Sequence, residues 1–429
     1  MGKTIGVVGL WHLGCVLGVS WSKLGHKVIG FDHSKERVKL LQEGKSPLYE
    51  PYLEEQTIEE FKAGRLSFTD SLSGLNNCDF IFLSYDTPVR DDDSSDTSIL
   101  ENSVLELKSI MKDGSVLLVS SQSPVGYCAQ LRSLLKKTNP SLDIAYSPEN
   151  LRLGEALECY RNPGRIILGT ADPKTEKTCI ELFEEIHAEI IPMSLESAEM
   201  VKHGINSFLA NSIVFANHLA DICETHGGNI DDVVRGMKSD PRIGLKAYLA
   251  PGIGFSGGTL GRDLKVLQAK NDESAGFATL FEHIHKLNSE RKYAILKRIQ
   301  TILGTLQGKT IAALGVTYKP GTSTLRRSLP IEIVDLLLNK GCTVRLFDPK
   351  ADYTELKNAE RYLICSSPEE ALQDAELGIL LTEWKEFREF DWKRLIINMK
   401  NPAVFDTKNF LDGKLLESLG CRYYSVGRK

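Results

Sequence analysis

The sequence predicts an α/β protein in which two doubly wound domains are joined by an all-helical section. Three observations lead to this prediction. Short apolar runs alternate with helical patterns from the N-terminus, strand-like runs are missing from the middle of the chain, and the alternation resumes at Lys309. Repeated strand–helix–strand order is typical of parallel sheets that carry helices on both faces.

The first region contains short apolar runs without polar alternation, which indicates strands buried on both faces of a parallel sheet. They lie at residues 5–8, 28–31, 80–84, 116–120, 144–146 and 166–168. Helical spacing separates them, most clearly at residues 34–42 and 99–111. We expect residues 1–195 to form this first domain.

The middle section has helical patterns throughout. Residues 194–226 form one long stretch without proline that ends at Gly227-Gly228, and helical patterns continue to about Thr305 around a glycine-rich loop at 251–261. We expect residues 196–305 to form a helical domain. Because such long helices often build subunit interfaces, we also expect a homodimer.

The last region, residues 306–429, returns to alternation. Its strand candidates lie at residues 310–314, 344–347, 378–381 and 404–405. Open α/β sheets bind ligands at the carboxyl ends of their strands, so the cleft between the two α/β domains is the expected ligand site.

Composition excludes several functional classes. Lys and Arg number 52 and Asp and Glu number 57, a net charge of −5 without a basic block, so we expect no nucleic-acid partner. We expect no membrane segment, because no apolar run approaches the ~18 residues of a membrane helix, and no signal peptide precedes the first strand. Nine scattered cysteines without a Cys-x-x-Cys pair favour reduced thiols in the cytoplasm. His283 and His285 face apart on a helix, so we expect no metal site.

A dinucleotide fingerprint follows the first strand in altered form. Gly9 and Gly14 occupy the first and third glycine positions of G-x-G-x-x-G, but Trp11 replaces the middle glycine. Asp32 ends the second strand, where a carboxylate binds the adenosine ribose, and no arginine follows it before Arg37, so NAD is favoured over NADP. The alternative is a Rossmann-like domain that binds another ligand or none. A second match at 252–257 follows no strand and is not a Rossmann fingerprint.

Several ordered segments resemble motifs of the UDP-glucose/GDP-mannose dehydrogenase family, and the resemblance covers essentially the whole chain. Residues 46–51 resemble SPIYEP, 122–126 resemble TVPVG, 147–150 resemble NPEF, 241–244 resemble the segment before the active loop, 314–320 with 325–326 resemble the opening of the third domain, and 382–384 match TEW.

The resemblance implies an enzyme that oxidises the C6 alcohol of a nucleotide sugar to a carboxylate with two NAD, through a thioester on a cysteine, for polysaccharide synthesis. Lys202 and Asn206 fit the family's Lys-x-x-x-Asn pair, which at i and i+4 lies on one helix face. Glu149 and Asp263 fit its acid/base carboxylate and its water-holding aspartate.

The resemblance also implies two sets of binding residues. The NAD set comprises Gly9, Trp11, His12, Leu13, Gly14, Asp32, Arg37, Ser84 and Ser121. The nucleotide-sugar set comprises Arg242, Tyr248, Leu249, Gly254, Tyr318, Lys319, Arg326 and Lys408.

The sequence departs from the family pattern at the thioester chemistry. The family's active loop reads GFGGSCFPKD, and here Thr259 stands at the nucleophilic cysteine and Arg262 at the lysine. Gln122 replaces the threonine of TVPVG, Leu153 a glutamate, and Lys408 an arginine. Because Lys202, Asn206 and Asp263 remain, the sequence favours an NAD-dependent dehydrogenase that performs a single two-electron oxidation. The alternative is a catalytically lapsed homologue that binds a nucleotide sugar as a sensor or partner subunit.

Overall fold

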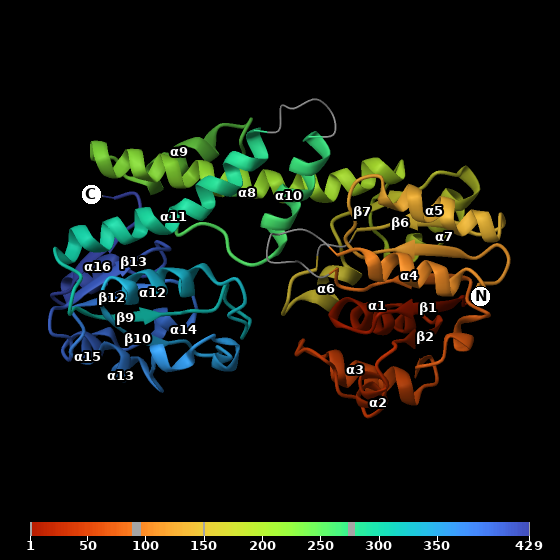
Figure 1. The fold of residues 1–429 in the computed structure, drawn as a ribbon, viewed down its shortest axis with the longest axis horizontal. Helices are drawn as coiled ribbons and strands as arrows, with labels where there is room; N and C mark the ends of the chain where they lie inside the picture. The colour runs from red at the N-terminus through yellow and green to blue at the C-terminus, as the bar shows by residue number, and fades with distance from the viewer. Residues whose placement is uncertain (1, 88–95, 149–150, 273–278, 429) are drawn as a thin grey trace. The chain divides into compact units, whose positions relative to one another are not determined.

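The computed structural model describes residues 2–87, 96–148, 151–272 and 279–428. The chain divides into two compact units, Met1–Gly204 and Ile205–Lys429 (Figure 1). The long helix α8, Leu195–His226, runs from the first unit into the second.

The first unit is built on an eight-stranded sheet with the order β3-β2-β1-β4-β5-β6-β7-β8. The stretch from β3 to β6 has the strand order of dinucleotide-binding folds, with its topological switch between β1 and β4. The strands are β1 Thr4–Val8, β2 Lys27–Phe31, β3 Leu66–Thr69, β4 Phe80–Leu83, β5 Val116–Val119, β6 Asp143–Tyr146, β7 Ile166–Gly169 and β8 Ile190–Met193.

Helices cover both faces of this sheet. One face packs against α1, α2, α3, α6 and α7 around the fully buried Trp21, and the other packs against α4, α5 and the start of α8. The helices are α1 His12–Lys23, α2 Lys35–Gln42, α3 Leu53–Lys62, α4 Ser98–Leu107, α5 Tyr127–Thr138, α6 Ala156–Arg161 and α7 Pro173–Phe183. Two buried faces explain why the central strands have continuous apolar runs.

All six strands expected in this region are present. The strands β3 and β8 and the antiparallel direction of β7 were not predicted. The edge strands β3 and β8 lack continuous apolar runs, since β3 alternates buried and exposed residues and β8 contains Pro192. The expectation that residues 166–168 join a purely parallel sheet was wrong, because β7 runs antiparallel to β6 and parallel to β8. Only the short helix α6 lies between β6 and β7, and apolar periodicity carries no information on strand direction.

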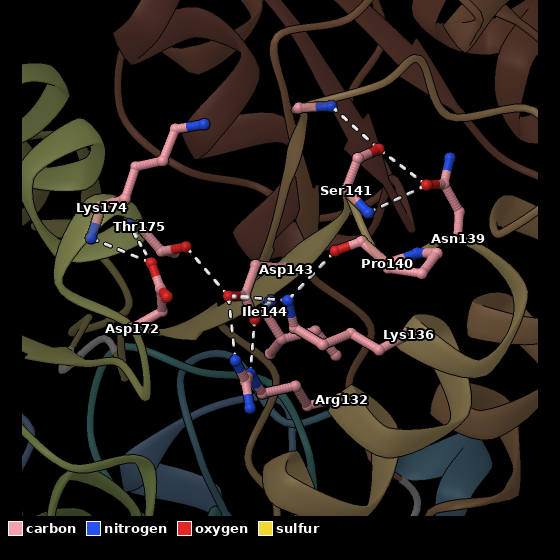
Figure 2. A network of polar contacts seen from close by, with 11 residues as sticks. Arg132, Lys136, Asn139, Pro140, Ser141, Asp143, Ile144, Asp172, Lys174 and Thr175 are labelled. Atoms are coloured by element: carbon pink, nitrogen blue, oxygen red, sulfur yellow. Dashed lines mark hydrogen bonds and ion pairs between the residues drawn. The ribbon is translucent and has the colours of Figure 1, made fainter.

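A buried carboxylate fixes the start of β6 (Figure 2). This position is at the amino end of the strand, whereas the ligand site at the switch point lies at the carboxyl ends. Asp143 pairs with Arg132 of α5 and accepts a hydrogen bond from the Thr175 hydroxyl of α7 at 3.0 Å. Burial raises the pKa of Asp143, but the bond from Arg132 and further contacts outweigh it, so the pKa lies below its ordinary value. This charged contact ties one helix from each face to the sheet.

The second unit contains a six-stranded, all-parallel sheet with the order β11-β10-β9-β12-β13-β14. The four expected strands are present, and the two strands that were not predicted, β11 and β14, lie at the sheet edges. The strands are β9 Thr310–Leu314, β10 Thr343–Phe347, β11 Leu363–Ile364, β12 Leu377–Leu380, β13 Ala403–Asp406 and β14 Arg422–Ser425.

Helices again cover both faces of the second sheet. The C-terminal half of α8 packs with α11 and α12 on one face, and α13, α15 and α16 pack on the other. The helices are α9 Ile230–Ser239, α10 Thr259–Asp272, α11 Thr279–Leu303, α12 Leu329–Asn339, α13 Pro368–Leu372, α14 Glu386–Glu389, α15 Trp392–Ile396 and α16 Gly413–Ser418. The described residues between 195 and 305 contain no strand, so the predicted fold class, two doubly wound sheets with a helical section between them in sequence, is confirmed. No described helix is long and apolar enough to cross a membrane.

The turn after the first strand is fixed in the same way in both sheets. Gly9 and Gly315 both have positive φ, +95° and +79°. The backbone N–H of the residue after each glycine donates to an aspartate at the end of the second strand, Leu10 to Asp32 at 2.8 Å and Val316 to Asp348 at 2.7 Å. Each unit therefore fixes its first strand–helix turn with a carboxylate.

We expect Asp348→Ala to destabilise the second unit by about 3 kcal/mol, since each buried donor left unpaired costs about 1–3 kcal/mol. Asp348 is buried and accepts from the backbone of Val316, Thr317, Lys350 and Ala351 and from the Trp384 indole. Denaturant unfolding followed by tryptophan fluorescence measures the effect.

The exposed Asp352→Ala is the control for this variant. Asp352 caps only a short 3₁₀ turn at the surface, so its removal should destabilise the protein much less than the removal of Asp348. Equal effects of the two substitutions would contradict the importance of the Asp348 contact.

Candidate functional site

The first strand–helix turn of the first unit presents backbone N–H groups at its surface. A Cβ on Gly9 would lie 2.7 Å from the Tyr85 ring, and one on Gly14 would lie 2.0 Å from the Gly9 carbonyl oxygen, so both positions require glycine. Helix α1 has no side-chain cap and no acidic residue in its first turn. Uncapped N–H groups at a helix N-terminus bind anions such as a pyrophosphate.

Trp11, which replaces the middle glycine, does not fill the helix N-terminus. Its ring lies against the Arg37 guanidinium, 5.2 Å from ring centroid to Cζ, and its side chain is 37% exposed. Arg37 in turn pairs with Asp32 at 2.7 Å. The indole therefore extends along the second-strand side of the turn, where the adenosine end of a dinucleotide binds in this fold.

Asp32 is oriented as a ribose acceptor requires. It is 3% exposed, and its two oxygens accept from the backbone N–H groups of Leu10 at 2.8 Å and Ser34 at 2.9 Å. A carboxylate has about four acceptor positions, so one position is left after these two bonds and the Arg37 pair. The residues of this turn fit the adenosine and pyrophosphate of NAD.

The remaining predicted cofactor residues hold this turn in place. The His12 Nε2 lies 2.9 Å from the buried Glu50, and Leu13 is buried in the core beneath α1. The Ser84 hydroxyl donates to the Gly9 carbonyl at 2.9 Å, and the Ser121 hydroxyl to the Leu83 carbonyl at 3.2 Å. Glu149, the predicted acid/base carboxylate, lies outside the described residues.

Helix α8 carries four polar residues on one face. With 3.6 residues per turn, Glu199, Lys202, His203 and Asn206 lie within an arc of about 100°. Glu199 and His203 are buried and Lys202 is half-buried. The Lys202 and Asn206 side chains are thus one turn apart on a rigid element.

Asn206 is joined to the predicted aspartate within the second unit. Its side-chain amide donates to the carboxylate of Asp263, which is fully buried in α10. The Arg262 guanidinium lies 3.8 Å from the other Asp263 oxygen. Thr259, the first residue of α10, is exposed and lies one helical turn before Asp263.

The glycine-rich loop before α10 is fixed by buried side chains of α8 and α11. Gly252 donates its N–H to Asn217 at 2.7 Å, and its carbonyl accepts from Arg291 at 2.9 Å. Both backbone groups of Phe255 bond to the Asn288 amide, at 2.8 and 2.9 Å. The loop therefore has a defined conformation that leads directly to Thr259.

Loops at the carboxyl ends of the second sheet meet this glycine-rich loop. Gly252 approaches Lys408, Gly254 lies against Asn288, and Gly257 lies against the Tyr318 ring. The Lys319 ammonium lies 5.7 Å from the same ring. Three of the predicted nucleotide-sugar residues, Tyr318, Lys319 and Lys408, therefore lie beside the loop that contains a fourth, Gly254.

The other predicted nucleotide-sugar residues are not shown to join this group. Arg242 is exposed and pairs with Asp240 at 2.7 Å, and the exposed Arg326 is held through its backbone by Glu355. Tyr248 is exposed and Leu249 half-buried. Their roles stay predictions.

Seven of the buried thiols are unsuited to replace the missing nucleophile. All nine cysteines are free, and eight are buried. Burial raises the pKa of seven thiols, for example to about 12 at Cys15 and to about 11 at Cys342, so these carry little thiolate at neutral pH. Cys159 is the half-buried exception.

The residues that hold the loops were not predicted from the sequence. Glu199 and His203 flank Lys202 on α8, and Asn288 and Arg291 lie one turn apart on α11. Polar residues at i and i+3 or i+4 on the buried face of an amphipathic helix are the pattern that indicates such roles.

Comparison with known proteins finds the same parts in the same order. Models of the NAD binding, central and UDP binding domains of the UDP-glucose/GDP-mannose dehydrogenase family match residues 3–187, 196–290 and 312–413. The chain is 33% identical to a UDP-glucose 6-dehydrogenase of Rickettsia felis, covering 98% of this chain and 96% of the relative. It is 31% identical to that of Rhizobium meliloti, covering 99% of each.

A solved structure has the same fold. The UDP-glucose dehydrogenase of the archaeon Pyrobaculum islandicum superposes with a TM-score of 0.89 at 26% identity, covering 100% of this chain and 98% of that one.

We expect NAD to bind at least ~10-fold more tightly than NADP, a difference of about 1.4 kcal/mol. The Asp32 carboxylate would repel a 2′-phosphate, and Arg37 is already paired with that carboxylate. Calorimetric titration measures both affinities. The variant Asp32→Asn should reduce the preference for NAD over NADP. Tighter binding of NADP to the unmodified protein would contradict this assignment.

Proposed function

The chain belongs to the UDP-glucose/GDP-mannose dehydrogenase family, and we propose that it oxidises the C6 alcohol of a nucleotide sugar to the aldehyde with one NAD. The Asn206–Asp263 pair, one helical turn from Lys202, is the observation that carries this proposal. UDP-glucose is the first substrate to test, because the similar proteins are named for it. The setting is the cytoplasm.

Oxidation of an alcohol requires groups that stabilise the developing alkoxide. NAD, when bound in the first unit, supplies the hydride acceptor. The Lys202 ammonium and the second hydrogen of the Asn206 amide donate to the substrate oxygen. Asp263 fixes the Asn206 amide by accepting its first hydrogen. Glu149 relays the released proton to solvent.

The second oxidation of the family reaction requires a nucleophile that Thr259 does not provide. A cysteine thiol is a few per cent ionised at neutral pH, whereas a threonine hydroxyl is not appreciably ionised there. The nearest carboxylate in α10, Asp263, is held by Asn206 and Arg262 and does not serve Thr259 as a base. The aldehyde is therefore released.

We expect one NADH per nucleotide sugar consumed and an aldehyde product. Spectrophotometric NADH counts against sugar consumption, with mass spectrometry of the product, measure both.

Lys202→Ala should keep its fold and lose about 100- to 1,000-fold in turnover, because it removes an electrostatic donor. Thr259→Ala should stay within about threefold of the unmodified enzyme, because a residue that takes no covalent part can be truncated at an exposed position.

Other outcomes of this experiment separate the alternatives. Two NADH per sugar and a uronic acid would show that a hydrated aldehyde gives up a second hydride without a thiol. Sugar binding without any NAD binding or turnover would favour the lapsed homologue that acts as a sensor or partner subunit.

We also propose that α8 forms the interface of a homodimer. Phe208, Phe215 and Ile222 are 66%, 47% and 57% exposed, and their seven-residue spacing places them on one face of the helix. An apolar stripe centred on Phe215 can pair with a second copy of itself about a twofold axis, as a symmetric dimer requires.

We expect Phe215→Glu to convert a dimer into a monomer, because two carboxylates would oppose each other across the twofold axis. Light scattering at micromolar concentration measures the mass. Ile397→Glu, at a 78% exposed position of the second unit, is the control and should leave the dimer intact. A monomer before any substitution would contradict the proposal.

A further inference from the structure

The loop after β5 is bound to helix α8 by two buried side chains. Glu199 is 0% exposed and accepts from the backbone N–H groups of Gly126 at 2.6 Å and Cys128 at 2.8 Å. The His203 ring, 1% exposed, lies 2.9 Å from the Ser123 carbonyl oxygen through its Nε2. Both ends of the segment 123–128 are thus held by one face of α8.

Ser123 adds a third contact that depends on this chain's own sequence. Its hydroxyl donates to Glu199 at 3.2 Å, whereas the family motif TVPVG places valine at this position. The Glu199 carboxylate also lies at the N-terminus of α5, where the helix dipole and unpaired N–H groups favour an anion. These bonds offset the cost of burying the carboxylate.

Lys202 lies between the two holding residues in the sequence of α8. Glu199 precedes it by three residues and His203 follows it directly, so the three side chains leave the same turn of the helix. The segment 123–128 follows Ser121, a predicted cofactor residue, and Gln122, which replaces the family's threonine. Any shift of this loop against α8 would change the distance from Lys202 to a cofactor bound at Ser121.

We infer that Glu199 and His203 are positioning residues for hydride transfer. They hold the segment 123–128, which follows the predicted cofactor residue Ser121, at a fixed distance from Lys202. The inference rests on the proposed function. Misplacement of reacting groups by about 1 Å can cost ~100-fold in rate, so a segment held by these four bonds affects the chemical step directly.

A cap that only stabilised α5 would behave differently. Losing it would lower the fraction of folded enzyme, so kcat would fall while the isotope effect on hydride transfer stayed constant. Losing a positioning contact slows the chemical step itself, so the isotope effect measured with sugar deuterated at C6 rises as kcat falls.

The test compares Glu199→Gln with Glu196→Gln, an exposed glutamate one turn earlier on α8. Glutamine keeps the shape of Glu199, but its NH₂ group opposes one of the two backbone N–H donors. We expect kcat to fall about 10- to 100-fold with a larger isotope effect. KM for the nucleotide sugar should change less than threefold, because none of the predicted nucleotide-sugar residues lies in this segment. Glu196→Gln should match the unmodified enzyme.

His203 offers an independent pair of variants. His203→Gln keeps a side-chain N–H that can donate to the Ser123 carbonyl and should retain most of the rate. His203→Leu removes the bond and should resemble Glu199→Gln. Equal isotope effects in Glu199→Gln, His203→Leu and the unmodified enzyme would overturn the inference.

A second measurement keeps the inference separate from the proposed function. If the unmodified protein oxidises no UDP-, GDP- or dTDP-sugar, the proposed function fails. NAD titration and amide hydrogen exchange then test whether Glu199 holds the segment 123–128 in place. Glu199→Gln should then expose the Gly126 and Cys128 amides to faster exchange and weaken NAD binding about 10-fold. Unchanged exchange and NAD affinity would overturn the inference.

Discussion

The hydrogen bond from the backbone after the first glycine to the aspartate that ends the second strand is the constraint on which both units depend. It fixes where the chain leaves the sheet and therefore where a ligand meets backbone N–H groups. The two units use it differently. Asp348 is covered by the Trp384 indole and the Thr317 hydroxyl, whereas Asp32 pairs with the Arg37 side chain. Only the first unit thus keeps an aspartate with an acceptor position for a ribose.

A second constraint is that buried side chains of long helices form hydrogen bonds with loop backbone. It recurs in the loops next to the predicted site residues. Asn217 and Asn288 hold the glycine-rich loop, and Glu199 holds the loop after β5. Because each buried polar group must find a partner, these bonds select one loop conformation rather than merely adding stability. Reacting side chains are thereby carried on rigid helices, and their neighbours are fixed to those same helices.

The sequence predicted what depends on periodicity and spacing. Buried strands such as residues 116–119 carry continuous apolar runs. The family resemblance identified Lys202 and Asn206, and helical spacing then placed the two on one face of α8. Edge strands such as β14, the reversed direction of β7, and the partners of buried polar residues depend on long-range contacts that no local pattern encodes. Asp32 pairs with Arg37, five residues away, but Glu199 meets Ser123 across 76 residues.

The position of Thr259 explains how the nucleophile can be lost without loss of the fold. It is exposed at the start of α10, and the bonds that shape the loop are made by the backbone of Gly252 and Phe255. Threonine therefore replaces cysteine there without disturbing any of those bonds. In the proposed function, Lys202 and Asn206 of α8 stabilise the alkoxide. The Asn206–Asp263 pair is buried, so exchanging either member would leave a buried polar group unpaired. Under the proposed function, the loss of the nucleophile at Thr259 therefore leaves the groups that stabilise the alkoxide in place.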